Sequence, residues 1–194
     1  YGKGLPDSAF ESDFASFKTS ANDADTLIQP RTTSVVQTAG LTQEFYSGYY
    51  NDNLNFYVNK FIEQTSTETL VSGISTQQNH SRRYLGYFTA SEAGAFQFKT
   101  TSDDSSRWYV GDANQTVDNL IKEVQGNKNA KLVVNNGGTH GNVNVTGTKT
   151  MVNGGVYPIV IYYGNAGGQS TLTLEWKAPS GSLIQNLATH FTNN

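Results

Sequence analysis

Short runs of alternating apolar and polar residues occupy the chain from residue 40 onward. Residues 95–101 alternate with a period of two, which is typical of a half-buried strand. Residues 156–163 and 170–176 give the two strongest strand patterns, and they flank a polar loop at residues 164–169. We predict further strands at residues 41–46, 54–62, 83–88, 108–110, 131–134, 143–145 and 149–152.

Turns separate these strands at regular spacing, and no helix-length period follows residue 40. This pattern predicts an all-β fold, an antiparallel sandwich or barrel with short peripheral helical segments. Residues 1–39 are less regular, and Phe10, Phe14 and Phe17 recur at helical spacing. We expect these side chains to pack an N-terminal segment on the sandwich. Since no internal repeat or flexible linker is evident, the sequence predicts one domain over residues 1–194, with its core at about 40–180.

The composition narrows the possible functions. Charged residues make up only 15% of the chain, against about a quarter in an average protein, and the formal net charge is −3. No dense basic run is present, so we do not expect binding to nucleic acid or to an acidic membrane surface. No stretch approaches the ~18 apolar residues that a membrane span needs, so we expect no direct membrane insertion. The absence of cysteine excludes thiol catalysis, thiolate metal sites and disulfides. A polar but lightly charged surface is common in secreted and cell-surface β-proteins and in sugar binders.

Two polar loops hold the candidate chemistry. The first, residues 101–107, has Asp103 and Asp104 side by side, and the second, residues 164–169, has Asn165 among three glycines. Calcium takes about 6–8 oxygen ligands, commonly from carboxylates, amide groups and backbone carbonyls. The aspartates could supply two charges and Asn165 a neutral oxygen, while the glycines free the backbone to aim its carbonyls inward.

Adjacent aspartates would not ordinarily share one ion, because neighbouring side chains on an extended strand point to opposite faces. A cis peptide bond between Asp103 and Asp104 would turn both carboxylates to one side, so the metal hypothesis predicts that geometry. Two other interpretations stay open on the residues alone. The pair could cap a polar turn, or it could act in glycoside hydrolysis, although adjacent carboxylates suit separate acid and base roles poorly.

Five spaced motifs resemble one known family. In chain order they are residues 40–48 (GLTQEFYSG), 84–98 (YLGYFTASEAGAFQF), 101–111 (TSDDSSRWYVG), 152–163 (VNGGVYPIVIYY) and 172–176 (LTLEW). They resemble the anthrax protective-antigen (PA-fourteen) domain family, a β-sandwich also found in yeast flocculins, other fungal adhesins and large bacterial adhesins. The resemblance covers about residues 40–180 and implies a sandwich. The family's fungal lectins usually carry cysteine pairs, which this chain lacks, so a bacterial adhesin module is the closer fit.

The resemblance also implies a site. In the lectin branch, two adjacent aspartates with a cis peptide bind calcium together with an Asn side chain and backbone carbonyls of a second loop. The sugar then coordinates the ion through two neighbouring hydroxyls. The metal ligands implied here are Asp103, Asp104, Asn165, Gly167 and Gln169. The residues implied to border the sugar are Asp103, Asp104, Asn165, Gly168, Gln169 and Ser102. One departure is Ser105, which stands where the family commonly has glycine.

The resemblance thus implies a calcium-dependent lectin module of a secreted or cell-surface adhesin, without catalysis, that binds extracellular glycans through vicinal hydroxyls. We expect a monomeric module of a larger, bacterial surface protein. The alternative is a non-catalytic targeting or structural module of a glycosidase or toxin. Trp108, Tyr109 and Trp176 are the aromatics that could stack on a sugar, but their strand positions predict burial in the core. Nothing in the sequence selects among fucose, mannose, glucose and galactose.

Overall fold

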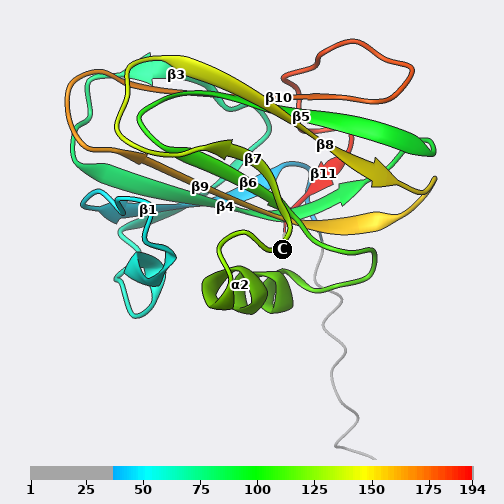
Figure 1. The fold of residues 1–194 in the computed structure, drawn as a ribbon, viewed down its shortest axis with the longest axis horizontal. Coiled ribbons are helices and arrows are strands. Elements are labelled where there is room, and N and C mark those ends of the chain that lie inside the picture. The colour runs from blue at the N-terminus through cyan, green and yellow to red at the C-terminus, as the bar shows by residue number, and fades with distance from the viewer. Residues whose placement is uncertain (1–36, 194) are drawn as a thin grey trace, which may run out of the picture. The chain divides into compact units, whose positions relative to one another are not determined.

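Two antiparallel sheets face each other across an aromatic core (Figure 1). The computed structural model describes residues 37–193. Its seven-stranded sheet has the order β2-β1-β4-β9-β6-β7, with β11 paired to β4, and its four-stranded sheet has the order β3-β10-β5-β8. This arrangement confirms the predicted antiparallel sandwich. The strands are β1 Leu41–Ser47, β2 Gln64–Glu68, β3 Ser72–Ser75, β4 His80–Thr89, β5 Gly94–Asp103, β6 Ser106–Val110, β7 Leu132–Asn136, β8 Val143–Met151, β9 Val156–Asn165, β10 Ser170–Lys177 and β11 Phe191–Thr192.

Strand β9 is buried on both faces. Tyr157, Ile159 and Ile161 belong to the core between the sheets. Val160 and Tyr162 belong to a second apolar cluster on the outer side of the seven-stranded sheet. A strand covered on both faces needs no apolar-polar alternation, which explains the continuous apolar run of β9 in the sequence. Strand β5 is covered on one face, and its burial alternates as the sequence predicts.

Two short helices cover the outer face of the seven-stranded sheet. They are a 3-10 helix, η1, at Leu54–Tyr57 and an α-helix, α2, at Val117–Gly126. Figure 1 shows α2 against this sheet, on the side away from the four-stranded sheet. Both helices contribute buried side chains to the second cluster. No helix within residues 37–193 is long and apolar enough to cross a membrane.

The strand predicted at residues 54–62 is wrong, because η1 begins there. Asn53 caps η1 by accepting a hydrogen bond from the backbone N–H of Asn55. Leu54 and Tyr57 are buried three residues apart, which is a helical rather than an alternating spacing. The apolar residues that follow, Val58 and Phe61, are exposed.

The prediction that no helix-length period follows residue 40 is also wrong, because α2 forms at Val117–Gly126. Thr116 caps this helix by accepting from the backbone N–H of Asn119. Val117, Leu120 and Val124 are buried at helical spacing against the seven-stranded sheet. The prediction of short peripheral helical segments nevertheless describes both helices correctly.

The strands predicted at residues 143–145 and 149–152 form one strand, β8. Gly147, which suggested a turn, lies in the ladder opposite Phe98. A Cβ atom at Gly147 would overlap the carbonyl oxygen of Val133, so this position is glycine because another backbone passes close to it. The short strands β2, β3 and β11 were not predicted, and Phe191 of β11 is buried in the main core.

The remaining predicted strands are confirmed, with ends that differ from the predicted ones by at most three residues. The burial predicted for Trp108, Tyr109 and Trp176 is confirmed as well. Phe10, Phe14 and Phe17, and with them most of the predicted N-terminal segment of residues 1–39, lie outside the described residues. The assignment of the whole chain to one domain therefore stays a prediction.

Replacing Gly147 by alanine should destabilise the sandwich, since the new methyl group would push β7 away from β8. Overpacking of this kind typically lowers the free energy of unfolding by about 1–3 kcal/mol. Gly126, at the end of α2, has no atom within 4 Å of an added Cβ and serves as the matched control. Urea unfolding should show the loss for Gly147→Ala and a change of no more than about 0.5 kcal/mol for Gly126→Ala. Equal stability of the two variants would contradict this account of β8.

Candidate functional site

The two loops singled out in the sequence lie at the same end of the sandwich. Asp103 ends β5 and is paired with Thr171 of β10, whereas Asn165 ends β9 and is paired with His80 of β4. The chain passes from the four-stranded to the seven-stranded sheet between Asp103 and Ser106. Asp104 therefore lies between the two sheets, and the peptide bond that joins it to Asp103 is cis, as the metal hypothesis predicts.

The Asp104 carboxylate holds three loops together. It is 3% exposed. Its Oδ1 accepts a hydrogen bond from the backbone N–H of His140 at 2.8 Å, and its Oδ2 accepts one from Ala166 at 2.8 Å. These bonds link the β5–β6 connection to the β7–β8 loop and to the β9–β10 loop. A buried carboxylate needs such partners, because burial without them is costly.

The Asp103 carboxylate is half-buried beside that of Asp104. Burial raises the pKa of Asp103, the negative charge of Asp104 raises it further, and His140 opposes the shift. The Asp103 carbonyl oxygen accepts a hydrogen bond from the Tyr163 hydroxyl at 2.8 Å, and Ser170 Oγ lies 2.7 Å from the same hydroxyl. The strand ends thus hold two mutually repelling carboxylates in place, an arrangement that a cation would relieve.

Asn165 has an oxygen without a partner. Its Nδ2 donates to the carbonyl oxygen of Gln77 at 3.0 Å, which fixes the orientation of the side-chain amide. Its Oδ1 is buried and accepts no hydrogen bond from any described residue. Since buried polar atoms are normally satisfied, this oxygen is suited to an additional ligand.

These residues fit a hard cation that prefers oxygen. Within residues 37–193, no group of three or more His, Cys, Asp or Glu side chains could hold a metal ion. The Asp103 and Asp104 carboxylates and Asn165 Oδ1 would therefore need backbone carbonyls to complete a coordination shell. Gly167 and Gln169 lie in the exposed turn that follows Asn165. An all-oxygen donor set favours calcium or magnesium over zinc or copper.

Gly168 and Ser102 occupy different parts of the site. Gly168 is exposed in the β9–β10 turn and has a φ of 77°, a conformation that favours glycine. Ser102 is 0% exposed, and its hydroxyl lies within hydrogen-bond distance of Ser106 Oγ and Asn136 Nδ2. The expectation that Ser102 borders a sugar does not fit this burial. Its hydroxyl instead ties β5 to β6 and β7 beneath the site.

Asp52 was missed by the sequence reasoning. It precedes η1, and its Oδ2 accepts a hydrogen bond from the backbone N–H of Gly138 at 2.7 Å. Its Oδ1 accepts from the Ser105 hydroxyl and from Arg107 Nε, the latter at 3.2 Å. Asp52 thus connects the residue after Asp104 to the loop that carries His140. The only signal in the sequence is the charge of Arg107, which calls for an acidic partner, but several acidic residues could fill that role.

Hydrogen bonds shift the pKa of Asp52. Burial alone would raise this pKa, but the bonds from Arg107, Ser105 and Gly138 lower it below the ordinary value. Hydrogen bonding to a charged group commonly contributes about 1.5–3 kcal/mol. Asp52 and Arg107 therefore brace the site without facing the Asp103–Asp104 pair directly.

The substitution Asp52→Asn should lower the free energy of unfolding by about 1–3 kcal/mol at neutral pH. Because the folded pKa of Asp52 is lowered, its stabilisation is complete above 3.8, the ordinary value, and is lost as the pH falls through the folded value. The difference between wild type and variant should therefore shrink in strong acid. Urea unfolding at several pH values measures this. Asp112→Asn, at a carboxylate whose side chain is 62% exposed, is the matched control and should change stability little. A similar effect of both substitutions at neutral pH would show that Asp52 does not brace the site.

The fold is similar to solved PA14 domains at low sequence identity. The PA14 domain of the antifreeze protein MpAFP matches with a TM-score of 0.64 and 16% identity, over 85% of this chain and 96% of that one. The PA14 sugar-binding domain from an RTX adhesin matches with a TM-score of 0.63 and 17% identity, over 81% of this chain and 99% of that one. The A domain of epithelial adhesin 6 from Candida glabrata was solved in complex with Galb1-3GlcNAc. It matches with a TM-score of 0.63 and 15% identity, over 85% of this chain and 90% of that one. The chain spans about half, 48%, of an anti-sigma factor domain-containing protein that it also matches.

Sequence comparison gives the same family. No curated protein sequence matches the chain. The PA14 domain model matches residues 37–186, which cover most of the described sandwich. The match includes both loops of the candidate site and all strands from β1 to β10. The chain therefore belongs to the PA14 domain family.

Proposed function

We propose that this chain is a calcium-dependent carbohydrate-binding module of a secreted or cell-surface adhesin. The observation that carries the proposal is the unpartnered, buried Oδ1 of Asn165 beside the Asp103–Asp104 pair. Sugar-bound relatives of the same fold add support. The A domain of epithelial adhesin 9 from Candida glabrata was solved with Galb1-4GlcNAc, and the RTX adhesin domain is described as sugar-binding.

In this proposal, the side chains of Asp103, Asp104 and Asn165 hold calcium together with the backbone carbonyls of Gly167 and Gln169. Bound calcium would supply open coordination positions for two neighbouring hydroxyls of a sugar. The protein orients the oxygens of Asp104 and Asn165 before any ion binds. Two backbone N–H groups hold the Asp104 carboxylate, and Gln77 holds the Asn165 amide.

The exposed β9–β10 turn would border the sugar through Gly168 and Gln169. Both residues are exposed and follow the buried Asn165 in the chain. So few contacts imply weak binding, on the order of 1 mM or about −4 kcal/mol for one sugar. Several copies on one surface would turn such weak sites into stable adhesion to glycans. Binding alone requires no acid or base at the site, so we propose no catalytic activity.

Thermal unfolding with and without calcium tests the proposal. Calcium at about 100 times its Kd should add about 2.7 kcal/mol to the free energy of unfolding, which corresponds to several degrees in Tm. Excess chelator should reverse the shift. Monosaccharides with vicinal hydroxyls should raise Tm further only when calcium is present. Failure of calcium to shift Tm, or of every sugar to add to it, would favour a structural module over a lectin.

The substitution Asp103→Asn separates metal binding from folding. It removes the repulsion between the two carboxylates, so the variant should be as stable as wild type, or more stable, in chelator. It should lose both the calcium shift and the sugar shift. Asp118→Asn, at an exposed carboxylate on α2, is the matched control and should keep both shifts. Retention of sugar binding in Asp103→Asn would remove the metal-bridged mechanism.

A further inference from the structure

The two sheets separate at one edge of the sandwich and leave a cavity of about 350 Å³. This volume is at the lower end of the ~300–1,000 Å³ typical of small-molecule sites. One wall is the inward face of β1, β2 and β4, and the opposite wall is formed by β3 and β10. We call this cavity the edge pocket and define it by six of its lining residues: Gln43, Glu68, Val71, Arg82, Tyr84 and Leu172.

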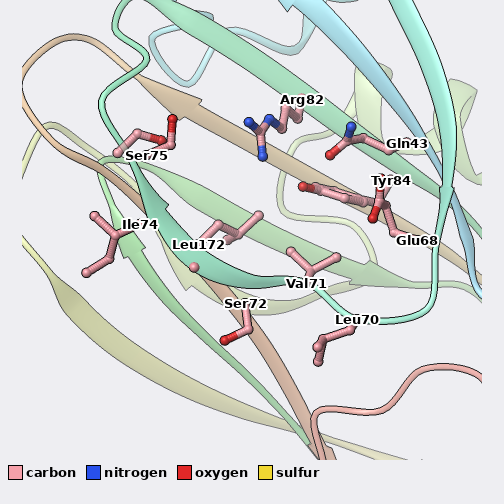
Figure 2. Close-up of a pocket in the computed structure, with 12 residues that line it drawn as sticks. Gln43, Glu68, Leu70, Val71, Ser72, Ile74, Ser75, Arg82, Tyr84 and Leu172 are labelled. Atoms are coloured by element: carbon pink, nitrogen blue, oxygen red, sulfur yellow. The ribbon is translucent and has the colours of Figure 1, made fainter.

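The edge pocket has a polar group on one wall and a mixed opposite wall, in which Val71 and Leu172 lie among serines (Figure 2). The polar ends of Arg82, Gln43 and Tyr84 lie together on the seven-stranded sheet. Val71 and Leu172 face them with aliphatic side chains. Positions on the inner face of a sandwich are normally apolar, so this polar group departs from the rule for the fold.

Arg82 forms no salt bridge with any described residue, although Glu68 lines the same pocket. Among residues 37–193, Arg83 is paired with Glu44 and Arg107 with Asp52, but Arg82 has no carboxylate partner. Its Nε is buried and donates no hydrogen bond, and its Nη2 reaches Gln77 Oε1 only at 3.5 Å. A guanidinium group in this state is suited to a carboxylate, which its planar fork binds in a bidentate manner.

The Tyr84 hydroxyl is a second unused donor. The residue is 0% exposed, and its hydroxyl has no hydrogen-bond partner in the described structure. Burial raises the pKa of Tyr84 to about 12, so the hydroxyl stays protonated at neutral pH. Tyr84 lies two residues from Arg82 on β4, and both side chains face the pocket.

Acceptors lie beside these donors. Gln43 is paired with Tyr84 in the β1–β4 ladder. Its Nε2 donates to Ser66 Oγ, and Ser66 Oγ donates to Glu68 Oε1 at 2.7 Å. This chain of bonds fixes the Glu68 carboxylate and the Gln43 amide at the pocket wall. A simple inorganic anion would gain nothing from Glu68, whereas a ligand with both a carboxylate and hydroxyls would use the donors and the acceptors together.

We propose that the edge pocket binds a sugar acid of monosaccharide size, with its carboxylate on Arg82 and Tyr84 and its hydroxyls on Glu68 and Gln43. Val71 and Leu172 pack against the apolar face of the sugar ring. This site is separate from the Asp103–Asp104 pair and needs no metal. Its ligand class differs accordingly, because the edge pocket selects for a negative charge rather than for vicinal hydroxyls alone.

Calorimetric titration in excess chelator tests the edge pocket apart from any calcium site. The probes are D-galacturonate and D-glucuronate, and the comparisons are galactose, glucose and sodium acetate at equal ionic strength. At least one uronate should bind and raise Tm, whereas the neutral sugars and acetate should not. Equal effects of acetate and the uronates would overturn the assignment to a sugar acid. Absence of binding by both uronates would overturn it as well.

Two substitutions locate the binding. Arg82→Gln should weaken uronate binding by at least about tenfold, since a hydrogen-bonded charge pair is lost. Tyr84→Phe should weaken it by several-fold while keeping Tm in the absence of ligand, because the hydroxyl has no partner in the described structure. Lys122→Gln removes an exposed charge on α2 and should leave binding unchanged. Unchanged binding in both edge-pocket variants would sink the proposal.

Asp103→Asn distinguishes this proposal from the calcium-dependent one. The variant should keep uronate binding even if it loses every calcium effect. Loss of uronate binding in Asp103→Asn, with its fold intact, would place the ligand at the loop site and overturn the edge-pocket assignment.

Discussion

The burial of the Asp104 carboxylate is the constraint on which the candidate site depends. Asp104 is 3% exposed, so its charge has to be compensated, and two backbone N–H groups from different loops provide part of that compensation. Those bonds fix the β7–β8 and β9–β10 loops against the connection between the sheets. They leave the neighbouring Asp103 charge and the Asn165 oxygen without an equivalent partner. The same interaction that orders the loops therefore leaves a set of oxygens suited to a cation.

The sequence predicts the parts of this arrangement that depend on local pattern. Alternation predicts β5 and the continuous apolar run predicts β9, and both predicted strands end two residues before the observed ends at Asp103 and Asn165. The cis peptide follows on steric grounds only from the hypothesis that both aspartates bind one ion, and the residues alone left a polar turn open as well. Helix α2 was also readable in principle, since Thr116 and the spacing of Leu120 and Val124 are ordinary signals. It was overlooked because polar residues surround it.

Other features depend on contacts between distant segments, which no local pattern encodes. Asp52 and Gly138 are 86 positions apart and meet only because η1 and the β7–β8 loop reach the same end of the sandwich. The burial of Ser102 follows from the side of β5 that it occupies and from Asn136 on β7. The edge pocket likewise combines β1, β2, β3, β4 and β10. The sequence does not show that Arg82 lacks a salt bridge, because the acidic partners of Arg83 and Arg107 are known only from the structure.

The loop site and the edge pocket share a wall, although their chemistry differs. Gln77 accepts from Asn165 through its backbone and from Arg82 through its side chain. Ser170 lines the edge pocket and lies 2.7 Å from the Tyr163 hydroxyl, which donates to the Asp103 carbonyl. The contacts through Ser170 and Tyr163 are short and connect strand ends, whereas the contact between Arg82 and Gln77 is long, at 3.5 Å, and lies in the connection between β3 and β4. The fold thus places two carboxylates that suit a cation near a pocket in which Arg82 and Glu68 suit a ligand with both a carboxylate and hydroxyls. Because the loop site offers carboxylates and the edge pocket offers the Arg82 guanidinium beside Glu68, the two sites favour different ligand classes, a cation in the first and a ligand that carries both a carboxylate and hydroxyls in the second.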